Sequence, residues 1–128
     1  MKKYIPTTVR VLTGLMFTGS AIAGMMGKVP PPEPEAAQAF MGVLFSSGLL
    51  YVVKVLELLC GLALISGFFV PLALLVLAPI IVNIAFFHVA LDPSGLMVAV
   101  VLSGLWVGNA MAHRTELSPL LQPRARVV

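Results

Sequence analysis

The fold of this chain is decided by residues 49–91, where the sequence is LLYVVKVLELLCGLALISGFFVPLALLVLAPIIVNIAFFHVAL. Lys54 and Glu57 are the only Asp, Glu, Lys or Arg residues in this stretch. A turn-forming pair, Ser66 and Gly67, divides it into two apolar segments. Each segment approaches the roughly 20 apolar residues that a helix needs to cross a bilayer. The stretch therefore predicts a helical hairpin inside a membrane.

The composition of the whole chain is that of a membrane protein. Hydrophobic residues make up 59% of the 128 residues and charged residues 10%, against about 25% charged residues in a soluble domain. This length holds four spans with short loops and leaves no space for a separate soluble domain. We therefore expect an all-α integral membrane four-helix bundle, a single domain over residues 1–128, with spans at about 9–27, 49–69, 72–91 and 96–112.

The first expected span has a competing interpretation. Residues 1–23 begin with lysines, continue with an apolar run and end in Ala21-Ile22-Ala23, which is the pattern of a secretory signal peptide. Small residues such as Gly14 and Gly24 instead favour close packing against other membrane helices, which an excised peptide would not need. We expect a retained helix.

A proline-rich loop, residues 28–35, follows the first span and cannot be helical. Residues 36–45 return to helical spacing before Ser46, Ser47 and Gly48 interrupt it. This segment is too short to span the bilayer. One interpretation is a short amphipathic helix between the first and second spans, lying at the interface where it could act as a lid. The other is a long and kinked second span.

The distribution of positive charge predicts the orientation. With four spans both termini lie on one side, and the positive-inside rule makes that side the cytoplasm. The proline loop and the turn at Asp92 then face outward. The same distribution leaves no basic face for nucleic acid, and Cys60, the single cysteine, excludes an intrachain disulfide. Six of the eight Lys and Arg residues lie at the two ends of the chain: Lys2, Lys3, Arg10, Arg114, Arg124 and Arg126.

Polar residues of the hairpin predict a site inside the bundle. An ionisable side chain at bilayer depth costs at least ~2.5 kcal/mol, and Lys54 and Glu57, three positions apart, share a helix face and can neutralise each other. Glu57 and Asn83 are equally far from the inner turn, so at ~1.5 Å per residue they should share a depth and are candidate partners. Lys54 and His88 should lie nearer the outer surface, close to Asp92.

Each candidate also has a purely structural alternative. The pair of Lys54 and Glu57 could do no more than fix the helix register. Asn83 could hold two helices together, and His88 could be a solvated residue at the interface. A metal site made of Glu57, His88 and Asp92 is not expected, because these residues lack the close spacing of metal ligands.

Two further features of the apolar segments concern packing. Pro79 cannot donate a hydrogen bond to the carbonyl of Leu75, so the third span should kink there and open a cavity or leave an acceptor. Gly104 and Gly108 form a GxxxG face in the fourth span, which offers a helix–helix interface. Trp106 is expected to serve packing alone.

Taken in order, these residues resemble the DoxX-like family of small four-helix membrane proteins, over nearly the whole chain. Members often carry Gly then Lys near the end of the first helix, whereas here Gly24 is followed by Met25 and Met26. The resemblance rests on Arg10, Gly14 and Phe17 in the first helix, Lys54, Glu57 and Gly61 in the second, Gly67 with Pro71 and Leu72 at the turn, and most of all on residues 79–95, PIIVNIAFFHVALDPSG.

The resemblance implies a bacterial inner-membrane protein associated with redox chemistry, since the family takes its name from a subunit of a thiosulfate:quinone oxidoreductase. We expect a quinone-like or other hydrophobic molecule to bind in the outer half of the bundle. Glu57 would relay protons, while Asn83 and His88 would hydrogen-bond the ligand. A partner redox protein would supply electrons, because no cofactor-binding motif is visible and a self-sufficient enzyme is not expected.

Two other functions are compatible with the sequence. One is a binding or assembly module without catalysis, whose polar site holds a lipid or a partner protein. The other is a transporter or channel, for which four spans provide little pathway unless the protein forms a homo-oligomer.

Overall fold

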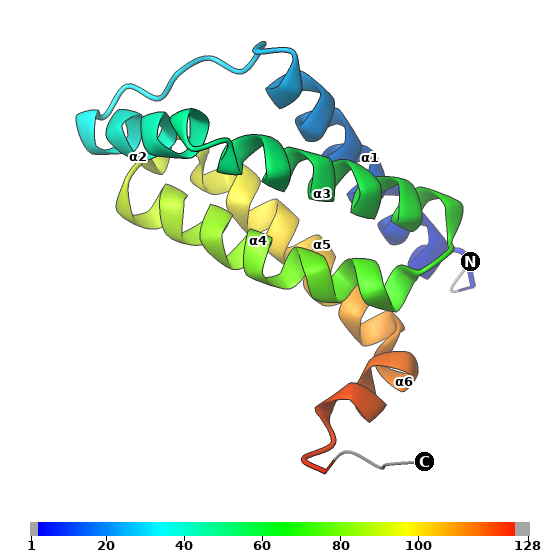
Figure 1. The fold of residues 1–128 in the computed structure, drawn as a ribbon. Helices are drawn as coiled ribbons and strands as arrows, with labels where there is room; N and C mark the ends of the chain where they lie inside the picture. Colours follow the sequence, from blue (N-terminus) through cyan, green and yellow to red (C-terminus); the bar gives the residue numbers. More distant parts are fainter. Residues whose placement is uncertain (1–2, 125–128) are drawn as a thin grey trace.

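A computed structural model describes residues 3–124 of the protein, and its fold is a bundle of long helices (Figure 1). The predicted fold class is confirmed: all elements are helical, and a short helix, α2 (Glu35–Ser46), lies between the first two spans. Lys2 and Arg126, which contribute to the predicted charge asymmetry, lie outside the described residues. The long helices are α1 (Ile5–Met25), α3 (Leu49–Ser66), α4 (Val70–Ala90) and α5 (Leu96–Ala112).

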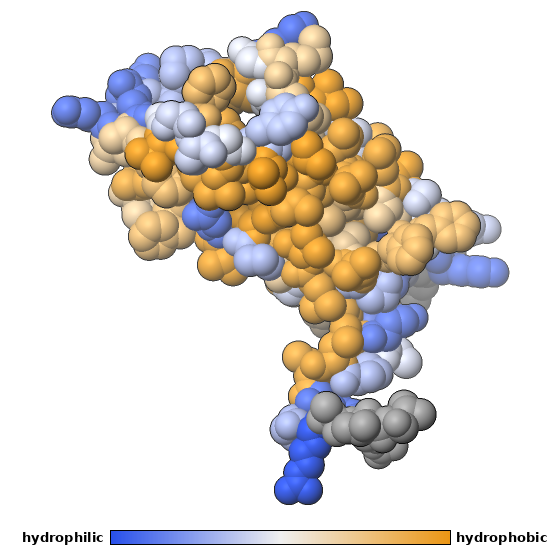
Figure 2. Space-filling view, viewed as in Figure 1, coloured by the Kyte–Doolittle hydropathy of each residue, from blue (hydrophilic) through white to orange (hydrophobic). Residues whose placement is uncertain are grey.

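Each long helix has the length and hydropathy of a membrane span, α5 together with the 3-10 turn Pro93–Gly95 that precedes it. Apolar side chains cover most of the middle of the molecule, and hydrophilic ones gather toward its ends (Figure 2). Such a surface is suited to lipid tails, so the protein is a multi-pass membrane protein in contact with a bilayer. After α5 the chain continues through α6 (Arg114–Leu117) and a second 3-10 turn, Ser118–Leu121.

Glycine and proline fix where the helices begin and end. Helix α1 starts before the expected span because Pro6 fits the first turn of a helix, where its missing N–H is not needed. Helix α3 ends before Gly67, whose left-handed φ of 84° allows its N–H to cap the carbonyl of Ala63. The next helix follows Phe69, which has a φ of 56°. That left-handed conformation costs a residue with a side chain about 1–2 kcal/mol.

Helix α2 is separate from α3, because Gly48 between them has a left-handed φ of 78°. This break favours the interpretation of two helices over that of one kinked span. The ring of Phe40 in α2 packs against Phe87 in α4, with ring centroids 5.7 Å apart. Helix α2 therefore lies against the end of α4 that is remote from the chain termini (Figure 1).

Facing glycines allow α1 and α3 to pack closely. A β-carbon on Gly14 would lie 2.7 Å from the carbonyl oxygen of Gly61 and 2.8 Å from a side-chain carbon of Ile65. A β-carbon on Gly61 would in turn lie 2.9 Å from the carbonyl oxygen of Gly14. Neither position has room for a side chain, and small residues of this kind are what permit backbones of membrane helices to approach.

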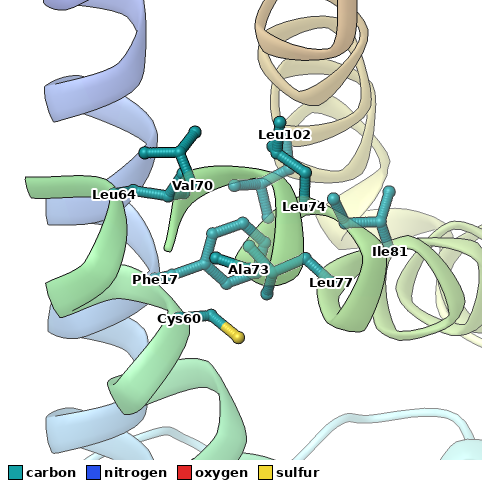
Figure 3. Close-up of a cluster of buried hydrophobic side chains, with 9 residues drawn as sticks. All are labelled: Phe17, Cys60, Leu64, Val70, Ala73, Leu74, Leu77, Ile81 and Leu102. Carbon is teal, nitrogen blue, oxygen red and sulfur yellow. The ribbon is translucent and has the colours of Figure 1, made fainter. Parts of the chain in front are cut away.

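The apolar core lies where α1, α3, α4 and α5 meet. Phe17 extends from α1 toward α3 and α4 and is 1% exposed (Figure 3). Trp106 does more than pack, because its indole N–H donates to the carbonyl of Leu74 at 2.9 Å. The other members of the core are Cys60, Leu64, Val70, Ala73, Leu74, Leu77, Ile81 and Leu102.

The proline-rich loop and the chain termini lie at opposite ends of the bundle, so labelling at each end tests the orientation of the protein in the membrane. Loop residues 28–34 and the turn after α4 lie at the end opposite the termini (Figure 1). If the termini are cytoplasmic, as the positive-inside rule predicts, Pro32→Cys and Ser94→Cys in a Cys60→Ala background should react with a membrane-impermeant maleimide from outside the cell. Ser118→Cys, at the other end, should react only in inverted vesicles. Labelling of Pro32→Cys or Ser94→Cys from the cytoplasmic side alone would reverse the orientation.

Candidate functional site

The predicted pairing of Lys54 and Glu57 is present in α3. The ammonium Nζ of Lys54 donates to Glu57 Oε2 at 2.9 Å. The Glu57 side chain is 3% exposed and that of Lys54 is 16% exposed. Two side chains three residues apart lie next to each other on one face of a helix and can form a salt bridge. Here the salt bridge pairs two charges that would otherwise face apolar surroundings.

Lys54 also ties α3 to α1, which sequence reasoning missed. Its Nζ donates a second hydrogen bond, 3.2 Å long, to the hydroxyl of Ser20. The aliphatic part of the lysine passes over Gly24, where a β-carbon would lie 2.7 Å from Lys54 Cε. Gly24 therefore provides the space that the lysine chain occupies.

A further polar atom lies in the same α1–α3 interface. The hydroxyl oxygen of Thr18 is buried and has no hydrogen-bond partner among residues 3–124. It lies directly against Gly61, one helical turn beyond Glu57. A buried hydroxyl without a partner is uncommon, so this interface offers one unused hydrogen-bonding group near the ion pair.

His88 and Asp92 form a second group, at the C-terminal end of α4. The Nδ1 atom of His88 lies 2.9 Å from the backbone carbonyl oxygen of Asp92. Because a carbonyl can only accept, Nδ1 carries the hydrogen and Nε2 is the free nitrogen. The Asp92 carboxylate accepts from the Ser94 hydroxyl at 2.6 Å and from the Ser94 N–H at 3.2 Å. These two residues stabilise the turn, and no hydrogen bond within residues 3–124 joins them to Lys54 or Glu57.

Asn83 lies apart from both groups. It is exposed on α4 and makes no side-chain hydrogen bond within the described part of the chain, so the predicted contact with Glu57 is wrong. The equal depth of Asn83 and Glu57 in the bilayer does not determine the direction in which the Asn83 side chain points around the axis of α4. Helix α4 buries Leu77 and Ile81, and a residue two positions beyond Ile81 lies about 200° around the helix from it. The amide therefore faces away from the core.

A buried polar contact between α1 and α5 was not anticipated. Asn109 is fully buried, and its amide nitrogen donates to the Thr13 hydroxyl at 2.8 Å and to the carbonyl of Leu105 at 2.9 Å. The same pattern that drew attention to Asn83, an amide in an apolar helix, was present at Asn109. Among residues 3–124 no three His, Cys, Asp or Glu side chains converge as a metal ion would need.

Comparison with known proteins identifies one relationship. The family model described as DoxX matches residues 5–90, which comprise α1 to α4. No curated protein and no solved structure matches the chain.

The ion pair generates a stability prediction. Lys54→Met or Glu57→Leu alone leaves an uncompensated buried charge and should lower the free energy of unfolding by roughly 3–5 kcal/mol, whereas the double variant should lose much less. Thermal unfolding of the three variants in one detergent measures the coupling. Additive losses would show that the two side chains contribute independently and that the ion pair is not what stabilises them.

Proposed function

This chain belongs to the DoxX family, and on that premise we propose that it is a redox-associated subunit of a bacterial inner membrane that binds a quinone-like hydrophobic molecule at Lys54 and Glu57. The observation that carries the proposal is the buried ion pair, because charges at this depth are costly and mark ligand or proton pathways in membrane proteins. Membrane depth also suits a ligand that is itself dissolved in lipid.

The donor capacity of Lys54 supports ligand binding. An ammonium group has three N–H donors, and the contacts to Glu57 and Ser20 use two of them. The remaining N–H can donate to a carbonyl oxygen of a quinone ring. Since the lysine side chain is 16% exposed and that of Glu57 is 3% exposed, the ligand would meet the lysine first.

Glu57 is our candidate for proton transfer. Reduction of a quinone to a quinol takes electrons and protons in equal number, and a carboxylate beside the ligand can accept a proton and pass it on. The unpartnered hydroxyl of Thr18 lies one turn away. Near the same end of the bundle, the free Nε2 of His88 is our candidate for proton exchange with the outside. Electrons would come from a partner redox protein.

A ligand-binding experiment tests the proposal. We expect purified protein to bind a short-chain benzoquinone, and Lys54→Met to weaken binding about tenfold or more because a charge-assisted hydrogen bond is lost. The matched control is Lys28→Met, which removes the same charge from the exposed loop and should bind like the wild type. His88→Ala loses one hydrogen bond to the turn and should fold with little loss of stability. It should bind the reduced quinol more weakly, because a quinol hydroxyl can donate to Nε2 of His88. Equal binding by Lys54→Met and Lys28→Met, or none by the wild type, would contradict a quinone site at Lys54.

The outward position of Asn83 favours a second candidate function, that of an assembly module. Pro79 lies one turn before Asn83, and both are exposed. Pro79 has no N–H that could donate to the carbonyl of Leu75 four residues before it. The exposed Asn83 amide, which makes no side-chain hydrogen bond within residues 3–124, thus faces the lipid, where such a group gains from a partner. We propose that a second copy supplies it.

The oligomeric state tests this assembly function. Asn83→Leu should shift the protein from dimer to monomer, because the interface would lose its hydrogen bonds while the bundle loses none. Single-molecule photobleaching in bilayers measures the distribution of states. Val82→Leu, a change at the neighbouring exposed position, is the control. A wild-type protein that is monomeric in bilayers would exclude the assembly function.

A further inference from the structure

A cavity of about 450 Å³ lies at the end of the bundle that carries both chain termini, far along the helices from Lys54. It is formed by the first turns of α1, the turn between α3 and α4, and the chain after α5. Neither proposed function uses it. The lining residues are Thr7, Arg10, Gly67, Phe69, Val70, Pro71, His113 and Glu116.

Arg10 provides positive charge in this cavity. Its side chain is half-buried, and the guanidinium lies over Gly67, with Cζ 3.2 Å from where a β-carbon would be. In residues 3–124 the only salt bridge is that of Lys54 with Glu57, so no carboxylate lies within 4.0 Å of Arg10. No hydrogen bond from the guanidinium to another described residue is present. The fork of N–H donors is therefore available to a ligand.

Two other lining residues, His113 and Glu116, also affect the electrostatics of the cavity. The Nδ1 atom of His113 lies 3.0 Å from the backbone carbonyl oxygen of Asn109, so it is the protonated nitrogen and Nε2 is free. Glu116 is exposed and brings a negative charge to the rim. The positive charge of Arg10 is half-buried, whereas the negative charge of Glu116 is exposed to solvent. The inner part of the cavity therefore favours an anion that reaches Arg10.

The surroundings favour a lipid as the source of that anion. The cavity lies at one end of the bundle, and toward the ends of the molecule the apolar surface gives way to hydrophilic residues (Figure 2), which is where we expect phospholipid phosphates. Phe68 and Phe69 beside it are 72% and 74% exposed, which gives the cavity an apolar edge suited to the acyl chains of a lipid. Phe69 keeps its left-handed backbone there, so an exposed ring is held at the edge of the cavity.

We propose that this cavity binds the phosphate group of an anionic phospholipid. Arg10 would hold two phosphate oxygens through its planar fork, a geometry that lysine cannot reproduce. The Thr7 hydroxyl supplies a further donor, and Phe69 contacts the glycerol and first methylenes. Basic pockets between membrane helices bind lipid head groups in this way.

Native mass spectrometry of the full chain with phosphatidylglycerol tests the proposal. Wild type should retain phosphatidylglycerol over phosphatidylcholine. Arg10→Gln should weaken that retention about tenfold, and Arg10→Lys should also weaken it although the charge is kept. Arg114→Gln is the matched control: it removes an exposed charge at the same end, outside the cavity, and should change retention less than about twofold. Glu116→Gln should strengthen retention.

Several results would overturn the proposal. Equal weakening in Arg10→Gln and Arg114→Gln would mean that net charge, and not the cavity, retains the lipid. Unchanged retention of phosphatidylglycerol in both Arg10 variants would exclude Arg10 as the residue that binds the phosphate group. Binding of inorganic phosphate is measured in a second experiment. If phosphate binding depends on Arg10 and the protein retains phosphatidylglycerol no better than phosphatidylcholine, the site holds a free phosphate and not a lipid. Unfolding curves of every variant without added lipid separate loss of binding from loss of fold.

Discussion

No water reaches the hydrocarbon region of a bilayer, so every polar group in these helices must find a partner within protein. This constraint explains why the spans are helical and why several of their polar side chains pair with one another. Lys54 contacts Glu57 and Ser20, and Asn109 contacts Thr13. The groups that lack a partner, the Thr18 hydroxyl above all, are then the places where a ligand or another chain would be bound.

Much of the architecture follows from the sequence because the same constraint acts locally. Apolar length predicted four spans, and Ser66 and Gly67 predicted the turn between α3 and α4. The expected span 49–69 nevertheless ran three residues past Ser66, where α3 ends before the left-handed Gly67. The pairing of Lys54 with Glu57 was predictable because both residues lie on one helix, so their spacing alone fixes their contact. The family could also be predicted from the sequence, and the match of the DoxX family model to residues 5–90 confirms it.

Contacts between helices were harder to predict, since they depend on rotation about each helix axis. Asn83 and Asn109 make the difference plain: both are amides in apolar helices, yet one faces outward and the other is fully buried against Thr13. Depth along a helix can be counted from the sequence, but direction around it depends on packing, here on the core formed by Phe17 and its neighbours. The link from Lys54 to Ser20 was missed for the same reason.

The ion pair within α3 has a consequence for how the protein enters the membrane. A span that carries a lysine and a glutamate would be a poor substrate for insertion if each charge had to wait for a partner on another helix. Lys54 and Glu57 lie three residues apart on one helix, so they can neutralise each other as soon as that helix emerges from the ribosome. Helix α1, synthesised earlier, already offers Ser20 and the space above Gly24. Biogenesis of the charged span thus depends only on chain that has already been made.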